Sequence, residues 1–262
     1  MGTTREALEA ALAAEPESVA LHSAYADLLI EEGDPRGEYI RLELMLEDSG
    51  LNVKQRRSLK QKAESILKAN EREWLGPLYQ YVNSQLYSQH AELKWVRGWI
   101  ESISFLSMYL FNLDDLRHCP VIRMLRGISL CYTIPMSDHG SRVDKNYDSL
   151  LMALERMPLL RFSIFGIVNG DEAVEALVKC RFFSGLTHLQ MKECSMTDDG
   201  ARLLADHPHI SKLKHLDLRD NYLSPIGIAT LEELGLSISR SQRGNPAWED
   251  DRHNTGWGAD AV

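Results

Sequence analysis

The sequence is poor in cysteine and has no excess of basic residues. Its 262 residues include four cysteines, which are scattered without a C-x-x-C pair and without histidines at zinc-finger spacing. Neither a structural zinc site nor a disulfide framework is therefore indicated. The formal net charge is −9, whereas proteins that neutralise nucleic-acid phosphates need clustered lysine and arginine. We predict no metal, no cofactor and no nucleic-acid partner.

Long apolar runs are also missing. The first residues lack the basic region and continuous apolar stretch of a secretory signal, and no window approaches the roughly 20 apolar residues that a membrane-spanning helix needs. We expect a cytoplasmic protein with no membrane partner. The densest basic run lies between Lys54 and Lys62 in a helical pattern. It fits a solvated helix face or, alternatively, an anionic docking patch.

Residues 1–95 carry the pattern of two helical hairpins. Apolar residues recur with the 3.6-residue period of an α-helix in four segments, which begin near Thr3 or Thr4, Val19, Tyr39 and Leu59. A glycine- and proline-containing turn over residues 33–37 ends the second helix. The acidic residues near this turn have no accompanying histidine, nucleophilic lysine or glycine-rich loop. We therefore predict no catalytic residues and no enzyme activity.

One part of this region resembles a known family. The run LHSAYADLLIEEGDPRGEYIR, from Leu21 to Arg41, resembles the core motif of the repeat-companion domain of bacterial mosaic proteins. The segments 74–78 (WLGPL) and 97–103 (RGWIESI) are similar to later parts of that domain. Leu29 stands where the family usually has tryptophan, which indicates a repacked helix contact. The resemblance covers roughly the first hundred residues. It implies a domain that sits beside repeats and has no catalytic activity of its own.

The second half of the chain repeats itself with an offset of 27 residues. The pattern L-x-x-L-x-L-x-x-N/C occurs from Leu186 to Cys194 and again from Leu213 to Asn221. The same offset relates Gly200 to Gly227, and one step back lies a less regular unit that begins at Leu159. This pattern is that of a leucine-rich repeat. A repeat of this length with a full helix resembles the ribonuclease-inhibitor or RanGAP-like class, whose known activities are binding ones.

We therefore predict an α/β fold in three parts. A helical repeat-companion domain covers residues 1–95, and a short leucine-rich-repeat solenoid covers 96–238, with a concave parallel sheet and convex helices. The tail, 239–262, is expected to be flexible unless it docks. Further strands are expected at 100–105, at 125–130 and, in truncated form, at 236–238, with an insertion over 133–146. Cys194 and Asn221 should bond the turns of stacked repeats.

The residues between the inward-facing apolar positions of the last strands are expected to lie on the open face of the sheet. They mix charge, histidine and one aromatic ring, which is typical of protein-recognition surfaces. We predict that another protein binds there, through Arg161, Ser163, Phe165, His188, Gln190, Lys192, His215, Asp217 and Arg219. His188 and His215 form a conceivable metal pair, but we interpret them as surface histidines because the only further ligand is the adjacent Asp217.

The tail carries two tryptophans, Trp248 and Trp257, in a segment with no periodicity and few apolar residues. They suit docking on the repeats, docking into a partner, or modification or cleavage by an enzyme. Our main prediction is a non-catalytic interaction module, such as an adaptor, scaffold or regulatory subunit. The alternative is a precursor or enzyme substrate whose tail is processed.

Overall fold

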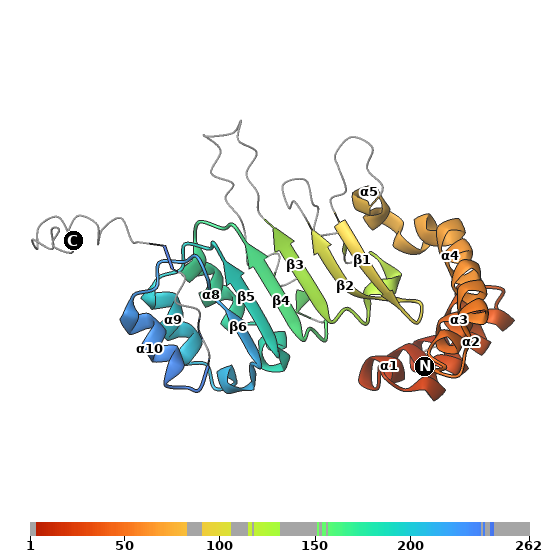
Figure 1. Cartoon of the computed structure of the whole chain (residues 1–262), viewed down its shortest axis with the longest axis horizontal. Coiled ribbons are helices and arrows are strands. Elements are labelled where there is room, and N and C mark those ends of the chain that lie inside the picture. The colour runs from red at the N-terminus through yellow and green to blue at the C-terminus, as the bar shows by residue number, and fades with distance from the viewer. Residues whose placement is uncertain are drawn as a thin grey trace, which may run out of the picture. The chain divides into compact units, whose positions relative to one another are not determined.

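The computed structural model describes residues 4–82, 91–105, 115–116, 118–131, 151, 154–155, 157–236, 238 and 242–243 (Figure 1). Over these residues the fold is mixed α/β. None of the described helices is both long and apolar enough to cross a bilayer. The predicted insertion over 133–146 and the tail tryptophans lie outside the described residues.

The described strands form one six-stranded sheet in which spatial order follows chain order. The strands are β1 (Ala91–Val96), β2 (Trp99–Phe105), β3 (Gly127–Cys131), β4 (Arg161–Phe165), β5 (His188–Lys192) and β6 (His215–Asp217). The predicted strands at 100–105 and 125–130 are confirmed as β2 and β3. The sheet is mostly parallel, and not parallel throughout as predicted, because β1 and β2 pair antiparallel.

The antiparallel pair arises from a two-residue turn. Arg97 and Gly98 both adopt positive φ, at 49° and 77°. Two such residues form a tight turn whose twist matches that of the flanking strands. Strand β1 was not predicted, and the predicted domain boundary between residues 95 and 96 falls inside it.

The chain divides into two compact units. Unit 1 comprises Met1–Ile128 with Arg156–Pro158, and unit 2 comprises Ser129–Glu155 with Leu159–Val262.

Three of the described helices of unit 1 begin at residues whose side chains cap them. The described helices of this unit are α1 (Thr4–Ala14), α2 (Val19–Glu31), α3 (Pro35–Leu46), α4 (Val53–Leu75) and the short α5 (Tyr79–Val82), the last preceded by a 3-10 turn over Gly76–Leu78. Ser18 caps α2, Asp34 caps α3 and Asn52 caps α4 in a reciprocal capping box. Helix α3 begins earlier than the predicted start near Tyr39, because the Asp34 carboxylate accepts the Arg36 N–H and Pro35 occupies the first turn.

Unit 2 contains three strand–helix pairs in a regular register. The helices are α8 (Gly170–Val178), α9 (Asp198–Ala205) and α10 (Pro225–Glu232), and short 3-10 turns at Arg181–Gly185 and Ile210–Lys212 lead into β5 and β6. Strands β4, β5 and β6 pair in parallel, with Arg161 opposite His188 and His188 opposite His215. The predicted 27-residue offset is therefore confirmed as the register of the sheet.

The predicted truncated strand at 236–238 is wrong for the residues described there. Leu236 and Ile238 are buried, but neither belongs to a strand. The chain turns at Gly235, which has a φ of 77°. Beyond this turn, the described residues Gln242 and Arg243 make hydrogen bonds to the last repeat.

Candidate functional site

One face of strands β4 to β6 carries eight of the nine predicted binding residues, and Arg219 lies in the turn after β6. Burial alternates along β4 and β5, so that Leu189 and Met191 are fully buried while their neighbours are partly exposed. Alternation with a period of two separates the core side of a strand from its open side. We call the nine predicted residues the strand face. They are Arg161, Ser163, Phe165, His188, Gln190, Lys192, His215, Asp217 and Arg219.

The sheet register brings these residues together in rows. The first row runs through Arg161, His188 and His215, and the second through Ser163, Gln190 and Asp217. A third joins Phe165 to Lys192. Ser163 donates a hydrogen bond of 3.0 Å to the Gln190 side chain, and the Lys192 amine lies 5.9 Å from the centre of the Phe165 ring. Side-chain contacts therefore join β4 to β5 within the second and third rows.

The rings of the two histidines of the first row lie beside each other at an angle of 38°, with ring centroids 5.9 Å apart. His188 Nδ1 lies 2.9 Å from the Thr187 hydroxyl, and His215 Nε2 lies 3.4 Å from the Gln190 amide nitrogen. Burial lowers the pKa of His188, and the nearby His215 and Arg161 act in the same direction. Among the described residues no group of three or more histidine, cysteine, aspartate or glutamate side chains is placed to hold a metal ion.

Asp217 was predicted to lie on the exposed face of the sheet, but its side chain is buried. It is only 5% exposed, because Arg219 covers it. The Arg219 guanidinium donates hydrogen bonds of 2.9 and 2.7 Å to the two carboxylate oxygens. This pairing holds the pKa of Asp217 below its usual value. The carboxylate is thus an internal partner of Arg219.

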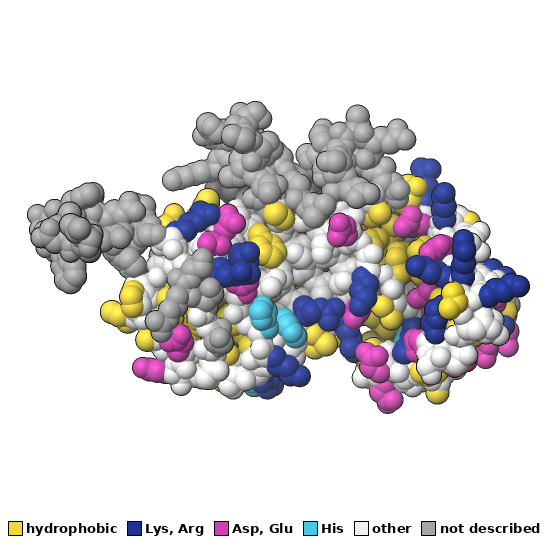
Figure 2. Space-filling model, in the orientation of Figure 1, with side chains coloured by type: hydrophobic (Ala, Val, Ile, Leu, Met, Phe, Trp, Pro, Cys, Tyr) yellow, Lys and Arg dark blue, Asp and Glu magenta, His cyan; other side chains and the backbone are white. Residues whose placement is uncertain are grey.

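The surface over β5 and β6 is rich in positive charge. Figure 2 shows histidine side chains side by side there, with lysine and arginine side chains around them. Three of the nine residues of the strand face are Lys or Arg, and its one acidic residue is the paired Asp217. Exposed Lys214 lies next to His215 and contributes to the lowered pKa of His188. The face is a basic area on a chain with a net charge of −9.

Asn221 is buried and links its own repeat to the preceding repeat by hydrogen bonds. It is fully buried, and its oxygen accepts the backbone N–H groups of Cys194 and Met196 at 2.9 and 3.1 Å. Its amide nitrogen donates to the carbonyls of Met191 and Leu218. Cys194, at the equivalent position one repeat earlier, directs its thiol to the carbonyl of Ile164. The predicted structural role of both residues is confirmed.

A second set of contacts also repeats, and it was not predicted from the sequence. Asp171 accepts hydrogen bonds from the backbone and hydroxyl of Thr197, which caps α9. One repeat later, Asp198 accepts the equivalent bonds from Ser224, which caps α10. The signal was available, because both aspartates and both hydroxyl residues are 27 positions apart. Residue 225, the next position in the aspartate series, is proline.

The first described part of the predicted tail is bound to the last repeat. The Gln242 side chain accepts the Asn221 N–H at 3.1 Å and donates to the Leu218 carbonyl at 3.0 Å. These contacts copy those that Asn221 makes to the preceding repeat. Arg243 donates its N–H to the Asn221 carbonyl and its guanidinium to Glu193. The tail was expected to be flexible unless it docks, and at residues 242 and 243 it contacts the last repeat.

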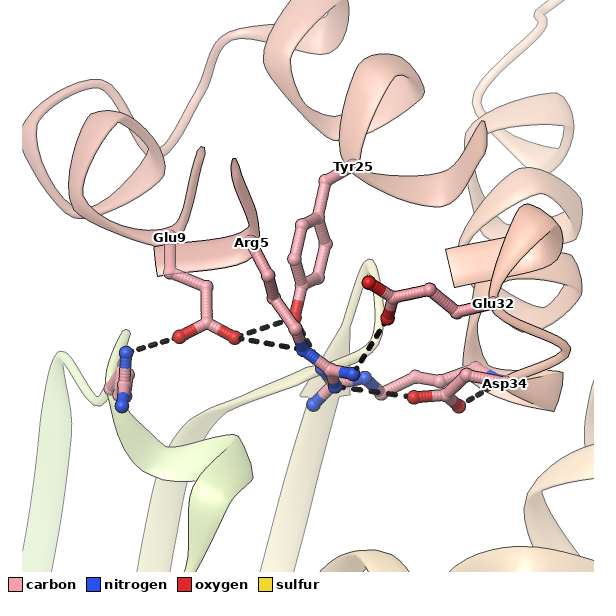
Figure 3. A network of polar contacts seen from close by, with 7 residues as sticks. Arg5, Glu9, Tyr25, Glu32 and Asp34 are labelled. Atoms are coloured by element: carbon pink, nitrogen blue, oxygen red, sulfur yellow. Dashed lines mark hydrogen bonds and ion pairs between the residues drawn. The ribbon is translucent and has the colours of Figure 1, made fainter. Parts of the chain in front are cut away.

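Unit 1 holds a different polar network (Figure 3). The Tyr25 hydroxyl donates to Glu9 at 2.8 Å and accepts from the buried Arg36. Glu9 also pairs with Arg5 and Arg123, and Arg5 continues to Glu32 and Asp34 at 3.0 and 3.2 Å. Burial raises the pKa of Tyr25 to about 12. Each acidic group in this network has a basic partner, and the contacts join α1 to α2 and to the start of α3.

The motifs quoted for the family resemblance meet in this unit. Arg36, from the first motif, lies 4.9 Å from the ring centre of Trp99, which belongs to the RGW segment. Trp99 in turn stacks on Tyr25 at 5.5 Å. A Cβ on Gly98 would lie 2.4 Å from the Ile40 side chain, and one on Gly37 would lie 2.5 Å from the Ala26 carbonyl. The motif residues thus contact one another, and their contacts are structural.

Comparisons with known proteins give little further information. No protein-family model matches the chain, and no curated protein matches it. A crystal structure of a protein from Bacteroides fragilis is similar with a TM-score of 0.44, at 25% identity over 51% of this chain. The chain covers 38% of that protein's length. A likeness of this size establishes neither fold nor function.

Proposed function

We propose that the chain is a non-catalytic protein-binding module that engages its partner through the strand face. Under this proposal its second half is a short leucine-rich-repeat solenoid, and its first hundred or so residues are a repeat-companion domain. The module would serve as an adaptor, scaffold or regulatory subunit. The observation that carries the proposal is the registered open face of β4, β5 and β6.

The repeat assignment is supported by contacts that recur at the sequence offset. Asn221 bonds the turn of the preceding repeat, and each aspartate before a helix accepts from the next helix cap. Stacked repeats whose backbone groups are paired by a buried asparagine are a feature of leucine-rich repeats. The binding assignment is supported by the composition of the face, since arginine and aromatic residues are the side chains that most often anchor protein partners.

A site-specific crosslinking experiment tests the proposal. A photoreactive amino acid is placed at exposed His215 and, as a matched control, at exposed Lys62 on α4, in the full chain expressed in its native cells. We expect a discrete protein adduct from position 215 and not from position 62. The adduct should disappear when Ser163→Trp fills the middle of the face. Identical adducts from both positions, or an adduct that survives Ser163→Trp in a normally folded variant, would overturn the proposal.

A further inference from the structure

Helix α10 carries apolar residues at positions where the two preceding helices carry charged ones. Helix α9 lies between α8 and α10, and the 27-residue offset relates the three helices (Figure 1). Exposed residues can therefore be compared at two positions: Glu172, Asp199 and Ile226 at the first, and Glu175, Arg202 and Ala229 at the second. At both positions the side chain is charged on α8 and α9 and apolar on α10.

The position of Ile226 in its helix gives no local reason for an isoleucine. Ile226 is 76% exposed and lies in the first turn of α10. An acidic side chain is favoured in a first turn, because the N-terminus of a helix carries a partial positive charge. Helices α8 and α9 have Glu172 and Asp199 at this position. The exchange of an acidic residue for isoleucine therefore indicates a contact that the other two helices do not make.

Ile226 belongs to a small apolar patch. Ala229 is its neighbour on the helix surface and is also a neighbour of exposed Pro225, because these residues are three and four positions apart. We call Pro225, Ile226 and Ala229 the α10 patch. Exposed apolar side chains that are grouped mark surfaces that pack against another segment or molecule.

The chain that follows the last repeat is anchored close to this patch. The Gln242 side chain accepts the N–H of Asn221, and Arg243 donates its own N–H to the Asn221 carbonyl at 2.7 Å. Asn221 precedes Ile226 by five residues, so the two are at most about 17 Å apart. Trp248 follows Arg243 by the same number of residues and has the same reach. The Trp248 ring can therefore contact the α10 patch.

We infer that the segment after Arg243 binds back on the last repeat, with the Trp248 ring packed on the α10 patch. Residues 244–262 lie outside those that the structure describes. A segment of the same chain is favoured over another molecule, because its attachment at Arg243 gives it a high effective concentration at the patch. Trp248 is favoured over Trp257, because a shorter loop from Arg243 costs less entropy to close. The inference does not depend on the proposed binding function.

Fluorine NMR of the full chain tests this contact. 5-Fluorotryptophan replaces the five tryptophans, and Trp248→Phe and Trp257→Phe assign the two signals of the tail. A synthetic peptide of residues 244–262 with the same label gives the signals of an undocked tail.

The patch variant is Ile226→Asp/Ala229→Arg, which gives α10 the side chains that α9 has at these positions and should therefore fold normally. The control is Val168→Asp, which places an acidic residue at a valine that is 63% exposed. Circular dichroism and thermal melting establish that each variant is folded.

In the original chain and in the control, we expect the Trp248 signal to differ from that of the peptide. In the patch variant it should move to the peptide position, because the docking equilibrium constant should fall at least about tenfold when a charged side chain replaces the isoleucine. A Trp248 signal at the peptide position in the original chain would overturn the inference. A displaced signal that persists in the folded patch variant would also overturn it, as would a response of Trp257 alone.

The same spectra, recorded at several protein concentrations, separate the tail of the same chain from a second copy. We expect the Trp248 signal to be independent of concentration, because docking within one chain does not change on dilution. A signal that approaches the peptide position on dilution would assign the α10 patch to a contact between copies and would overturn the inference.

Discussion

The two units stabilise their polar groups in different ways. In unit 1 the buried Arg36 contacts Tyr25 and Trp99, which are distant from each other in sequence. In unit 2 the contacts of Asn221 and of Asp198 have equivalents at an offset of 27 residues. A substitution of Arg36 should therefore disturb one network in unit 1. A substitution of Asn221 or Asp198 removes a contact between neighbouring repeats of unit 2.

Asn221→Ala should produce the largest effect on stability. It leaves backbone groups of two neighbouring turns without partners in a fully buried position. Each such group costs about 1–3 kcal/mol, so we expect the free energy of unfolding of unit 2 to fall by about 4 kcal/mol. Hydrogen exchange resolved by mass spectrometry measures this unit by unit. The control is Asn52→Ala at the exposed cap of α4, with an expected loss of about 1 kcal/mol. Equal effects would contradict the linking role of Asn221.

Arg36→Met should rank next and should act on unit 1. The methionine retains much of the apolar contact with Trp99 but removes the charge that pairs with the Tyr25 hydroxyl. We expect a loss of about 3 kcal/mol, within the range for breaking a buried charged contact. Urea unfolding followed by tryptophan fluorescence measures it. Arg41→Met, which removes an exposed ion pair with Asp27, should cost less than about 1 kcal/mol. A similar cost for both variants would show that burial of Arg36 has little effect.

Gly227→Ala should have an intermediate effect that depends on Asp198. A Cβ at this position would lie 2.1 Å from the Asp198 carboxylate, so we expect a loss of about 2 kcal/mol. In an Asp198→Ala background the added cost should be smaller by more than about 1 kcal/mol. Gly200→Ala with Asp171→Ala should give the same coupling, because a Cβ on Gly200 meets Asp171 at 2.5 Å. Additive effects in both pairs would contradict the equivalence of the two repeats.

The smallest effect should come from the protonation of His22 in unit 1. Burial lowers the pKa of this histidine below 6.5, and Arg97 adds to the effect. Between the lowered value and 6.5 the unfolded chain binds more protons, so the free energy of unfolding should fall as pH decreases. The slope is at most about 1.4 kcal/mol per pH unit.

The measurement is urea unfolding at a series of pH values in a Trp248→Phe/Trp257→Phe background, in which fluorescence comes from the tryptophans of unit 1. His22→Gln should flatten the dependence. His209→Gln in unit 2 is the control and should leave the unit 1 profile unchanged. An unchanged slope in His22→Gln would show that another group is responsible.

More of the structure of unit 2 than of unit 1 could be predicted from the sequence. The register of β4 to β6 followed from one offset, because repeated residues provide their own internal alignment. Strand β1 was missed because its antiparallel partner follows a turn, Arg97-Gly98, that was interpreted only as part of a family motif. The network around Arg36 joins segments that no local pattern connects, so it needed the three-dimensional structure.

The candidate site was only partly accessible from sequence. Alternation along each strand placed the nine residues on one face, but it carried no information about pairing between neighbours on that face. Asp217 was therefore expected to be exposed, whereas Arg219 covers it. Gln242 was missed for a related reason: it stands 21 positions after Asn221 and so does not follow the 27-residue offset, although it makes the same type of contacts.

The aspartate contacts determine where the array can lengthen. A tandem duplication of residues 198–224 would give each copy an aspartate facing the cap of the following helix, and an asparagine that bonds the preceding turn. Pro225 and Gln242 would remain at the end of the longer array, because both follow the duplicated segment. The chain therefore has a point at which whole repeats can be gained or lost during evolution without new contacts having to arise.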